Sequence, residues 1–180
     1  MLNNIAALIV DTAASVIAVA LLLRFWMQAV KVRPPEAIAR FVFKLSNWLV
    51  LPLRRVLPGV GGYDWASLFG CMLMAAIAVS AAIWMTPYFS AKIVLLLSVQ
   101  QMLNWIIYGF MGLLLLEVIF SWVNPNAPLA PFVSAMNAPL LRPLRRAIPT
   151  LGGIDLSVLI ALALLRVALH LMAGALATLA

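Results

Sequence analysis

The stretch WASLFGCMLMAAIAVSAAIWM, residues 65–85, contains no charged side chain in its 21 positions. A helix of about 20 mostly apolar residues is long enough to cross the hydrocarbon core of a bilayer. Residues 5–28 and 155–179 form two further, mainly apolar runs, and 102–123 is the best candidate for a fourth. The segment 90–101 contains a lysine and two glutamines, so it is either an interfacial segment or a tilted extension of the fourth run. The sequence therefore predicts an all-α membrane protein with four transmembrane helices.

The composition excludes most soluble classes of protein. Of 180 residues, 66% are hydrophobic and 9% are charged, whereas roughly a quarter are charged in soluble domains. A soluble enzyme, a disordered tail and a secreted disulfide scaffold are therefore excluded. The net charge of +7 comes largely from cations that flank the apolar runs. This placement favours contact with a membrane surface over direct binding of nucleic acid.

Residues 35–50 have the period of an amphipathic helix that does not span the membrane. Glu36, Arg40 and Lys44 follow one stripe of this helix, and apolar residues fill the other. We expect the helix to lie in the headgroup region; the alternative is a loop helix that packs against its own bundle. A shorter second helix is expected later in the chain, with an apolar face of three residues: Phe132, Val133 and Met136.

A thirteen-residue motif occurs twice. Residues 52–64, PLRRVLPGVGGYD, return as residues 143–155, PLRRAIPTLGGID, with eight identical positions at an offset of 91. Upstream, LLLR at 21–24 corresponds to LLLE at 114–117 at an offset of 93. The chain is therefore predicted to repeat one unit, in which a span, an interfacial helix, the motif loop and a second span follow one another.

The predicted domains are residues 1–87 and 88–180, one repeat each. Because each repeat has two spans, both repeats take the same orientation in the membrane. The loops 29–63 and 124–154 contain nine lysines and arginines, whereas the connection between the repeats contains only Lys92. By the positive-inside rule both motif loops are expected in the cytoplasm, and both chain termini on the outer side.

The repeated motif consists of residue types that shape turns. Pro52 and Pro143 are expected to begin a short helical turn. The glycine pairs permit positive φ where the chain reverses, and the aspartates are expected to cap the helices that follow. These turn and cap residues are Gly61, Gly62, Gly152, Gly153, Asp64 and Asp155.

The basic side chains of the loops are candidate contacts for anionic membrane lipids or for an acidic partner protein. Arginine can rest its stem on apolar surface and place its guanidinium group among lipid phosphates. The alternative is that the motif only forms turns and caps. The candidate binding residues are Arg40, Lys44, Arg54, Arg55, Arg142, Arg145 and Arg146.

Five ionisable residues lie inside the predicted spans. Arg24 and Glu117 occupy equivalent positions of the two repeats, so they are expected to pair with each other. Asp11 and His170 are expected to pair near the outer side, and Arg166 to reach Glu117 or a backbone carbonyl. Such charges either join helices or line a polar path in an oligomer. A lone histidine on an apolar helix indicates a structural role more strongly than haem ligation, and no cofactor, metal or catalytic residue is expected.

The duplicated motif, together with LRFWMQ at 23–28, resembles the bacterial YggT (YlmG-like) membrane family. The resemblance covers nearly the whole chain and implies a small inner-membrane protein made of two tandem family units. Relatives are associated with tolerance of osmotic shock and with the cell-division region. Plastid relatives are linked to cytochrome b6 haem assembly and nucleoid distribution. The second loop has Thr150 where the first has Gly59, so the two loops need not bind the same ligand.

These features lead to two functional hypotheses. The first is a non-enzymatic membrane organiser or assembly factor that binds lipid or a membrane protein partner through its basic loops. The second is a channel or transporter component for ions or osmolytes, formed by an oligomer around the intramembrane charges. The sequence leaves the oligomeric state and the identity of a partner open.

Overall fold

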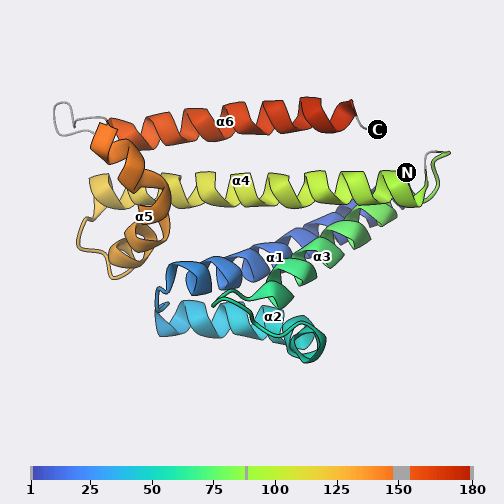
Figure 1. Ribbon diagram of the computed structural model, residues 1–180, viewed down its shortest axis with the longest axis horizontal. Helices are drawn as coiled ribbons and strands as arrows, with labels where there is room; N and C mark the ends of the chain where they lie inside the picture. Colours follow the sequence, from blue (N-terminus) through green and yellow to red (C-terminus); the bar gives the residue numbers. More distant parts are fainter. Residues whose placement is uncertain (1, 88, 148–154, 179–180) are drawn as a thin grey trace.

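The computed structural model describes residues 2–87, 89–147 and 155–178. In these residues the chain is helical and forms no β-sheet (Figure 1). The helices are α1 (Leu2–Val30), α2 (Glu36–Val56), α3 (Trp65–Ile83), α4 (Ala91–Val123), α5 (Ala130–Ala147) and α6 (Leu156–Ala177).

Four of the helices, α1, α3, α4 and α6, are long and apolar enough to cross a membrane. The predicted all-α fold with four spans is confirmed. Residues 91–101 belong to α4, which is one continuous helix of 33 residues. The segment is therefore an extension of the predicted fourth span and not a separate interfacial segment. At 1.5 Å per residue this helix is about 50 Å long, which exceeds a hydrocarbon core of about 30 Å. It must therefore tilt or extend beyond the core.

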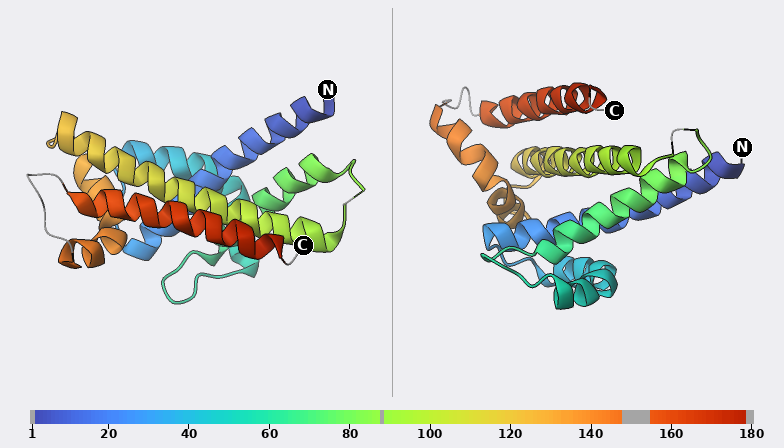
Figure 2. Two further views of the ribbon diagram at one scale, coloured as in Figure 1. Left: turned by 90° about the horizontal axis from the view of Figure 1, so that it is seen from above. Right: turned by 45° about the vertical axis from the view of Figure 1, so that its right-hand side comes forward.

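Both chain termini lie at the same end of the bundle, as Figure 1 and the two views of Figure 2 show. The connection between α1 and α2 lies at the other end, together with α5. The two repeats therefore share one orientation, as the even number of spans in each predicts. Helix α3 packs along α1 and also against α4, whereas α6 packs on α4 and α5.

The two shorter helices extend further into the motif than the sequence suggests. Helix α2 runs through Pro52 and ends at Val56, and α5 contains both Pro139 and Pro143. The prediction that Pro52 and Pro143 begin a separate turn is wrong. A proline inside a helix removes one backbone donor, yet both helices continue past their prolines. Helix α2 packs against α1 and α3, and α5 packs against α1, α4 and α6. The paired arginines consequently lie in the last turn of each helix.

Helix α5 uses its apolar face to join the repeats. Phe132, Val133 and Met136 are buried in one cluster with Met27 of α1 and Val42 of α2. The three residues expected to form the apolar face of this helix are therefore covered by protein. The indole of Trp26 donates a hydrogen bond to the Met136 carbonyl at 2.9 Å, and its ring meets Phe110 of α4 edge-on at 4.8 Å.

Candidate functional site in the two motif loops

One buried carboxylate ties the first motif loop to the first span. Asp64 is 1% exposed, and its Oδ2 accepts hydrogen bonds from Arg54 Nη2 at 2.6 Å and Arg24 Nε at 3.2 Å. Arg54 Nε also lies 3.3 Å from Oδ1, and the Ser67 hydroxyl donates to Oδ2 at 2.8 Å. Hydrogen bonds between ionised groups are stronger than neutral ones. Asp64 is thus the centre of a network with an arginine on either side.

The guanidinium group of Arg24 extends this network to α2. Its Nη1 donates to Ser46 Oγ at 2.9 Å and to Asn47 Oδ1 at 2.7 Å. The group also lies 5.0 Å from the centroid of the Phe43 ring, within the range of a cation–π contact. One buried arginine therefore joins α1, α2 and the start of α3.

The glycine pair of the first loop brings the chain back toward α1. Gly61 and Gly62 have φ of 68° and 82°, as predicted, and such values are unfavourable for residues with a Cβ. The Gln28 side-chain amide donates to the Gly62 carbonyl at 3.1 Å. Asp64 then occupies the N-cap position of α3, but its carboxylate makes no cap hydrogen bond to the backbone. The capping prediction for Asp64 is wrong because the two arginines and Ser67 take its oxygens.

The second loop has the opposite arrangement, with an arginine at its centre. Arg145 Nη2 donates to Glu117 Oε1 at 2.9 Å, and Arg145 Nε donates to Asp155 Oδ2 at 2.7 Å. Asp155 also accepts a hydrogen bond from the Ser157 backbone N–H at 3.0 Å, so its capping role is confirmed. Gly152 and Gly153 lie outside the described residues, so their predicted turn stays a prediction.

Glu117 is also bound to α5 through two polar side chains. The Ser134 hydroxyl donates to Oε1 at 3.3 Å, and Asn137 Nδ2 donates to Oε2 at 2.7 Å and to the Leu113 carbonyl at 2.9 Å. Asn137 stands 91 positions after Ser46, the partner of Arg24. Sequence reasoning missed both residues, although their shared offset and polar character were available as a signal.

The predicted pairs between intramembrane charges are wrong. Arg24 and Glu117 each pair with the motif loop of their own repeat. Asp11 accepts a hydrogen bond from Gln101 Nε2 at 3.2 Å instead of pairing with His170. The His170 ring is hydrogen-bonded through Nδ1 to the Arg166 carbonyl at 3.0 Å. Arg166 is exposed on α6 and, within the described residues, contacts neither Glu117 nor a backbone carbonyl through its side chain.

The ion pairs set the charge states of the loop residues. Burial alone raises the pKa of Asp64, but hydrogen bonds from Arg54 and Ser67 and the charges of Arg54 and Arg24 hold the pKa below its usual value. The pKa of Asp155 is lowered in the same way, since Arg145 and Ser157 outweigh the effect of burial. For Arg145, burial lowers the pKa, but Asp155 and Glu117 raise it above its usual value. All three groups are charged at neutral pH.

Several predicted binding residues remain at the surface. Arg40 forms only an exposed pair with Glu36 at 3.5 Å, and pairs of this kind contribute little. The other exposed cations of this group make no ion pair within the part of the chain that the structure describes. They are Lys44, Arg55, Arg142 and Arg146. Arg54 and Arg145, by contrast, are engaged in the networks above.

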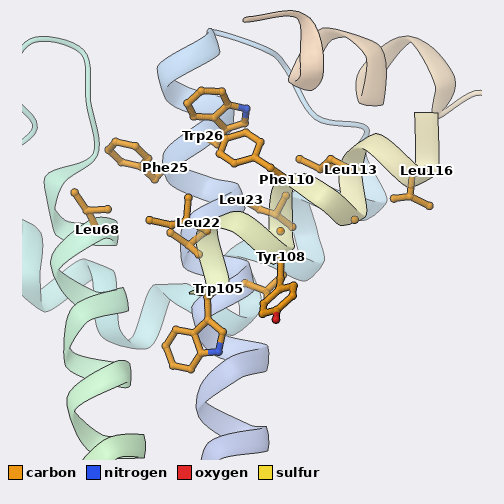
Figure 3. Close-up of a pocket in the computed structure, with 14 residues that line it drawn as sticks. Leu22, Leu23, Phe25, Trp26, Leu68, Trp105, Tyr108, Phe110, Leu113 and Leu116 are labelled. Atoms are coloured by element: carbon orange, nitrogen blue, oxygen red, sulfur yellow. The ribbon is translucent and has the colours of Figure 1, made fainter. Parts of the chain in front are cut away.

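An apolar cavity of about 380 Å³ lies between the repeats. Figure 3 shows Trp26 of α1 beside Phe110 of α4, with Phe25 and Leu68 on one side and Trp105 at the other end of the lining. Because its lining is apolar, this cavity can hold apolar groups and offers no continuous polar path. Within the described residues, no three His, Cys, Asp or Glu side chains gather as a metal site would require.

The fold and the two networks define a multi-pass helical membrane protein built from two tandem copies of one unit. A family model described as CCB3/YggT matches residues 3–85 and again residues 96–176. The chain therefore belongs to the CCB3/YggT family, as its duplicated motif indicates.

The similar proteins include several bacterial members of this kind. An uncharacterized protein of Pseudomonas aeruginosa is 33% identical over 87% of this chain and 82% of its own length. The uncharacterized protein YggT of Escherichia coli is 31% identical over 91% of this chain and 87% of its own length. An uncharacterized protein of Haemophilus influenzae is 30% identical, with coverage of 88% and 86%. No solved structure matches the chain.

Proposed function

We propose that this chain is a non-enzymatic organising or assembly factor of the bacterial inner membrane. Its motif loops face the cytoplasm, where exposed cations bind anionic lipid headgroups or an acidic membrane protein partner. The excess of lysine and arginine in both motif loops supports this orientation. Each cation near an anionic leaflet contributes on the order of 1 kcal/mol to such binding.

The observation that carries the proposal is a division of roles within the paired arginines. The first member of each pair, Arg54 or Arg145, is held by an aspartate of its own motif. The second member, Arg55 or Arg146, is exposed beside it. A motif that served only to form turns and caps has no need of the second arginine, whereas a surface that binds anions does.

Crosslinking in native membranes tests this proposal. Photo-reactive residues at positions 56 and 147, next to the exposed arginines, are expected to capture anionic lipid or a defined protein. The triple charge reversal Arg55→Glu, Arg142→Glu and Arg146→Glu, read by a crosslinker at the neighbouring position 56, is expected to abolish that capture at an unchanged protein level. Lys92→Glu, in the first turn of α4, is the control and is expected to leave the pattern unchanged. An identical pattern in the triple variant contradicts the proposal.

A second candidate function, a channel or transporter component formed by an oligomer, is favoured by the exposed face of α6. Arg166 and His170 are both exposed on this span. Ionisable side chains inside a bilayer are costly unless another polar surface covers them. Another copy of the chain or another membrane protein can provide that surface. Reconstituted protein that passes no ion or small osmolyte under potential or tension contradicts this second function.

A further inference from the structure

A second cavity, of about 550 Å³, lies where α1 ends and the first motif loop returns. It is bounded by α1, the connection to α2, α2 itself and the turn at Gly62. Its lining contains no carboxylate and four cationic side chains: Arg24, Lys31, Arg33 and Arg54. Asp64, beside the cavity, balances one of the two arginines that it binds. The site therefore has an excess of positive charge.

The cations of this cavity have unused hydrogen-bond donors. Arg24 donates through Nε and Nη1 to protein atoms, but its Nη2 has no protein partner among the described residues. Lys31 and Arg33 likewise make no ion pair in that part of the chain. The buried guanidinium group of Arg24 is stabilised when an opposite charge completes its hydrogen bonds, whereas Lys31 and Arg33 are exposed and can turn toward an anion. Guanidinium and ammonium groups are the usual protein ligands of phosphate oxygens.

The backbone of Lys31 supports a role for its side chain. Lys31 is the sole non-glycine residue with positive φ in the described ranges, at 58°. Its N–H bonds to the Gln28 carbonyl at 3.1 Å, and the Val32 N–H bonds to the Met27 carbonyl at 3.0 Å. This is the pattern in which a helix usually ends on glycine. A lysine there is strained by about 1–2 kcal/mol, and such strain is concentrated at functional positions.

The second repeat shows that the fold does not require these cations. Helices α1 and α4 end at Val30 and Val123, at the offset of 93 that relates the two spans. At the same offset, Glu117, Asn124 and Asn126 replace the three cations Arg24, Lys31 and Arg33. Asn124 also has an extended backbone, with φ of −155°. These three cations are thus present in the first repeat and replaced in the second.

We propose that this cavity binds one phosphate-bearing anion, with Arg24, Lys31 and Arg33 as its principal ligands. The anion is either the phosphate group of an anionic phospholipid or a free phosphate. Arg24 lies about 9 Å before the end of α1, and Lys31 and Arg33 follow directly after that end. Arg55, Arg142 and Arg146, on which the test of the proposed function depends, do not line this cavity, so either proposal can fail without the other.

Native mass spectrometry of the full chain in a neutral detergent tests this site. The protein is titrated separately with phosphatidylglycerol, phosphatidylcholine and inorganic phosphate. We expect one equivalent of phosphatidylglycerol or of phosphate to bind per chain, and phosphatidylcholine to bind at least tenfold more weakly. Phosphate that binds or displaces phosphatidylglycerol identifies a soluble anion as a ligand, whereas phosphatidylglycerol binding that phosphate leaves unchanged identifies the lipid.

The double variant Lys31→Asn and Arg33→Asn gives the first repeat the residues of the second. Its affinity is expected to fall by about 10- to 30-fold, since each cation near an anionic group contributes on the order of tenfold or less. The control, Lys92→Asn, removes a cation in the first turn of α4, outside the cavity and outside both motif loops, and is expected to leave this affinity unchanged. An equal loss of affinity in this control, or no one-to-one binding by the unmodified chain, would overturn the proposal.

Lys31→Gly separates a binding role from a structural one. Glycine adopts positive φ without strain, so this variant is expected to unfold at a higher temperature while it binds the anion more weakly. If its affinity is unchanged, Lys31 is not a ligand, and that part of the proposal is wrong.

Discussion

The two repeats use the same motif to build networks of opposite charge order. In the first repeat a carboxylate, Asp64, lies between two arginines. In the second repeat an arginine, Arg145, lies between two carboxylates. The arginine–aspartate pair inside the motif is common to both, and only the third member, supplied by the first span of each repeat, changes sign. Duplication has thus kept the connection between loop and span while it reversed the charge of the site.

The networks also differ in depth. The central side chain of the first network is 1% exposed, whereas that of the second is 39% exposed. Removing one partner of a buried ion pair costs more stability than removing one partner of an exposed pair, because solvent cannot replace the missing partner. The first network is therefore expected to contribute more to stability, and the second to tolerate change.

Neutralising the two motif aspartates separately should produce the largest difference between the repeats. Asp64→Asn leaves Arg24 buried without a full counter-charge, and we expect a loss of about 3–5 kcal/mol in the free energy of unfolding. Asp155→Asn, the matched variant, removes a pair that is open to solvent and is expected to cost about 1 kcal/mol or less. Unfolding in detergent, followed by circular dichroism, measures both. Equal losses would mean that depth does not distinguish the two networks.

Acid should destabilise the fold by protonating Asp64 and Asp155, the motif carboxylates of the two loops. The folded-state pKa values of Asp64 and Asp155 are below the usual value of about 4. As the pH falls, these two carboxyl groups therefore take up protons in the unfolded chain before they do so in the folded chain. Their contribution to stability is complete above about pH 4–5 and is lost as the pH falls through the lower pKa values of the folded state.

We therefore expect the melting temperature of the unmodified chain to fall as the pH drops below about 4, the usual pKa of an aspartate. The double variant Asp64→Asn and Asp155→Asn should melt at a lower temperature with a flatter dependence on pH in this range. The same slope in both proteins would show that other groups cause the acid sensitivity.

The smallest effect on stability is expected from the second arginine of each motif. Arg55→Gln and Arg146→Gln remove exposed side chains that have no ion pair in the described part of the chain, so the melting temperature should not change measurably. Arg54→Gln, one position earlier, removes the 2.6 Å pair with Asp64 and should lower it clearly. A loss of stability in Arg55→Gln comparable to that in Arg54→Gln would contradict the division of roles.

The apolar runs and the internal repeat were enough to predict the spans and their shared orientation. Length and hydropathy decide which helices can cross a bilayer, and these quantities are local to the sequence. The positive φ of Gly61 and Gly62 was predictable for the same reason, since glycine in a turn is a local signal.

The contacts between distant residues were not predictable in this way. Equivalent positions and opposite signs suggested that Arg24 and Glu117 pair, but complementary charge does not select among several nearby partners. Each of them instead meets the motif loop of its own repeat, 40 residues from Arg24 and 28 from Glu117. The strained backbone of Lys31 gave no sequence signal either, because lysine is not a residue type that indicates a positive φ.

A pair of double-mutant cycles measures most directly whether each network is closed within its repeat. Arg24→Met is combined with Asp64→Asn in one cycle and with Glu117→Gln in the other, and the free energy of unfolding is measured for every variant. We predict a coupling energy of at least about 1 kcal/mol between Arg24 and Asp64, and less than about 0.5 kcal/mol between Arg24 and Glu117. Strong coupling of Arg24 to Glu117, with none to Asp64, would contradict the arrangement described for both repeats.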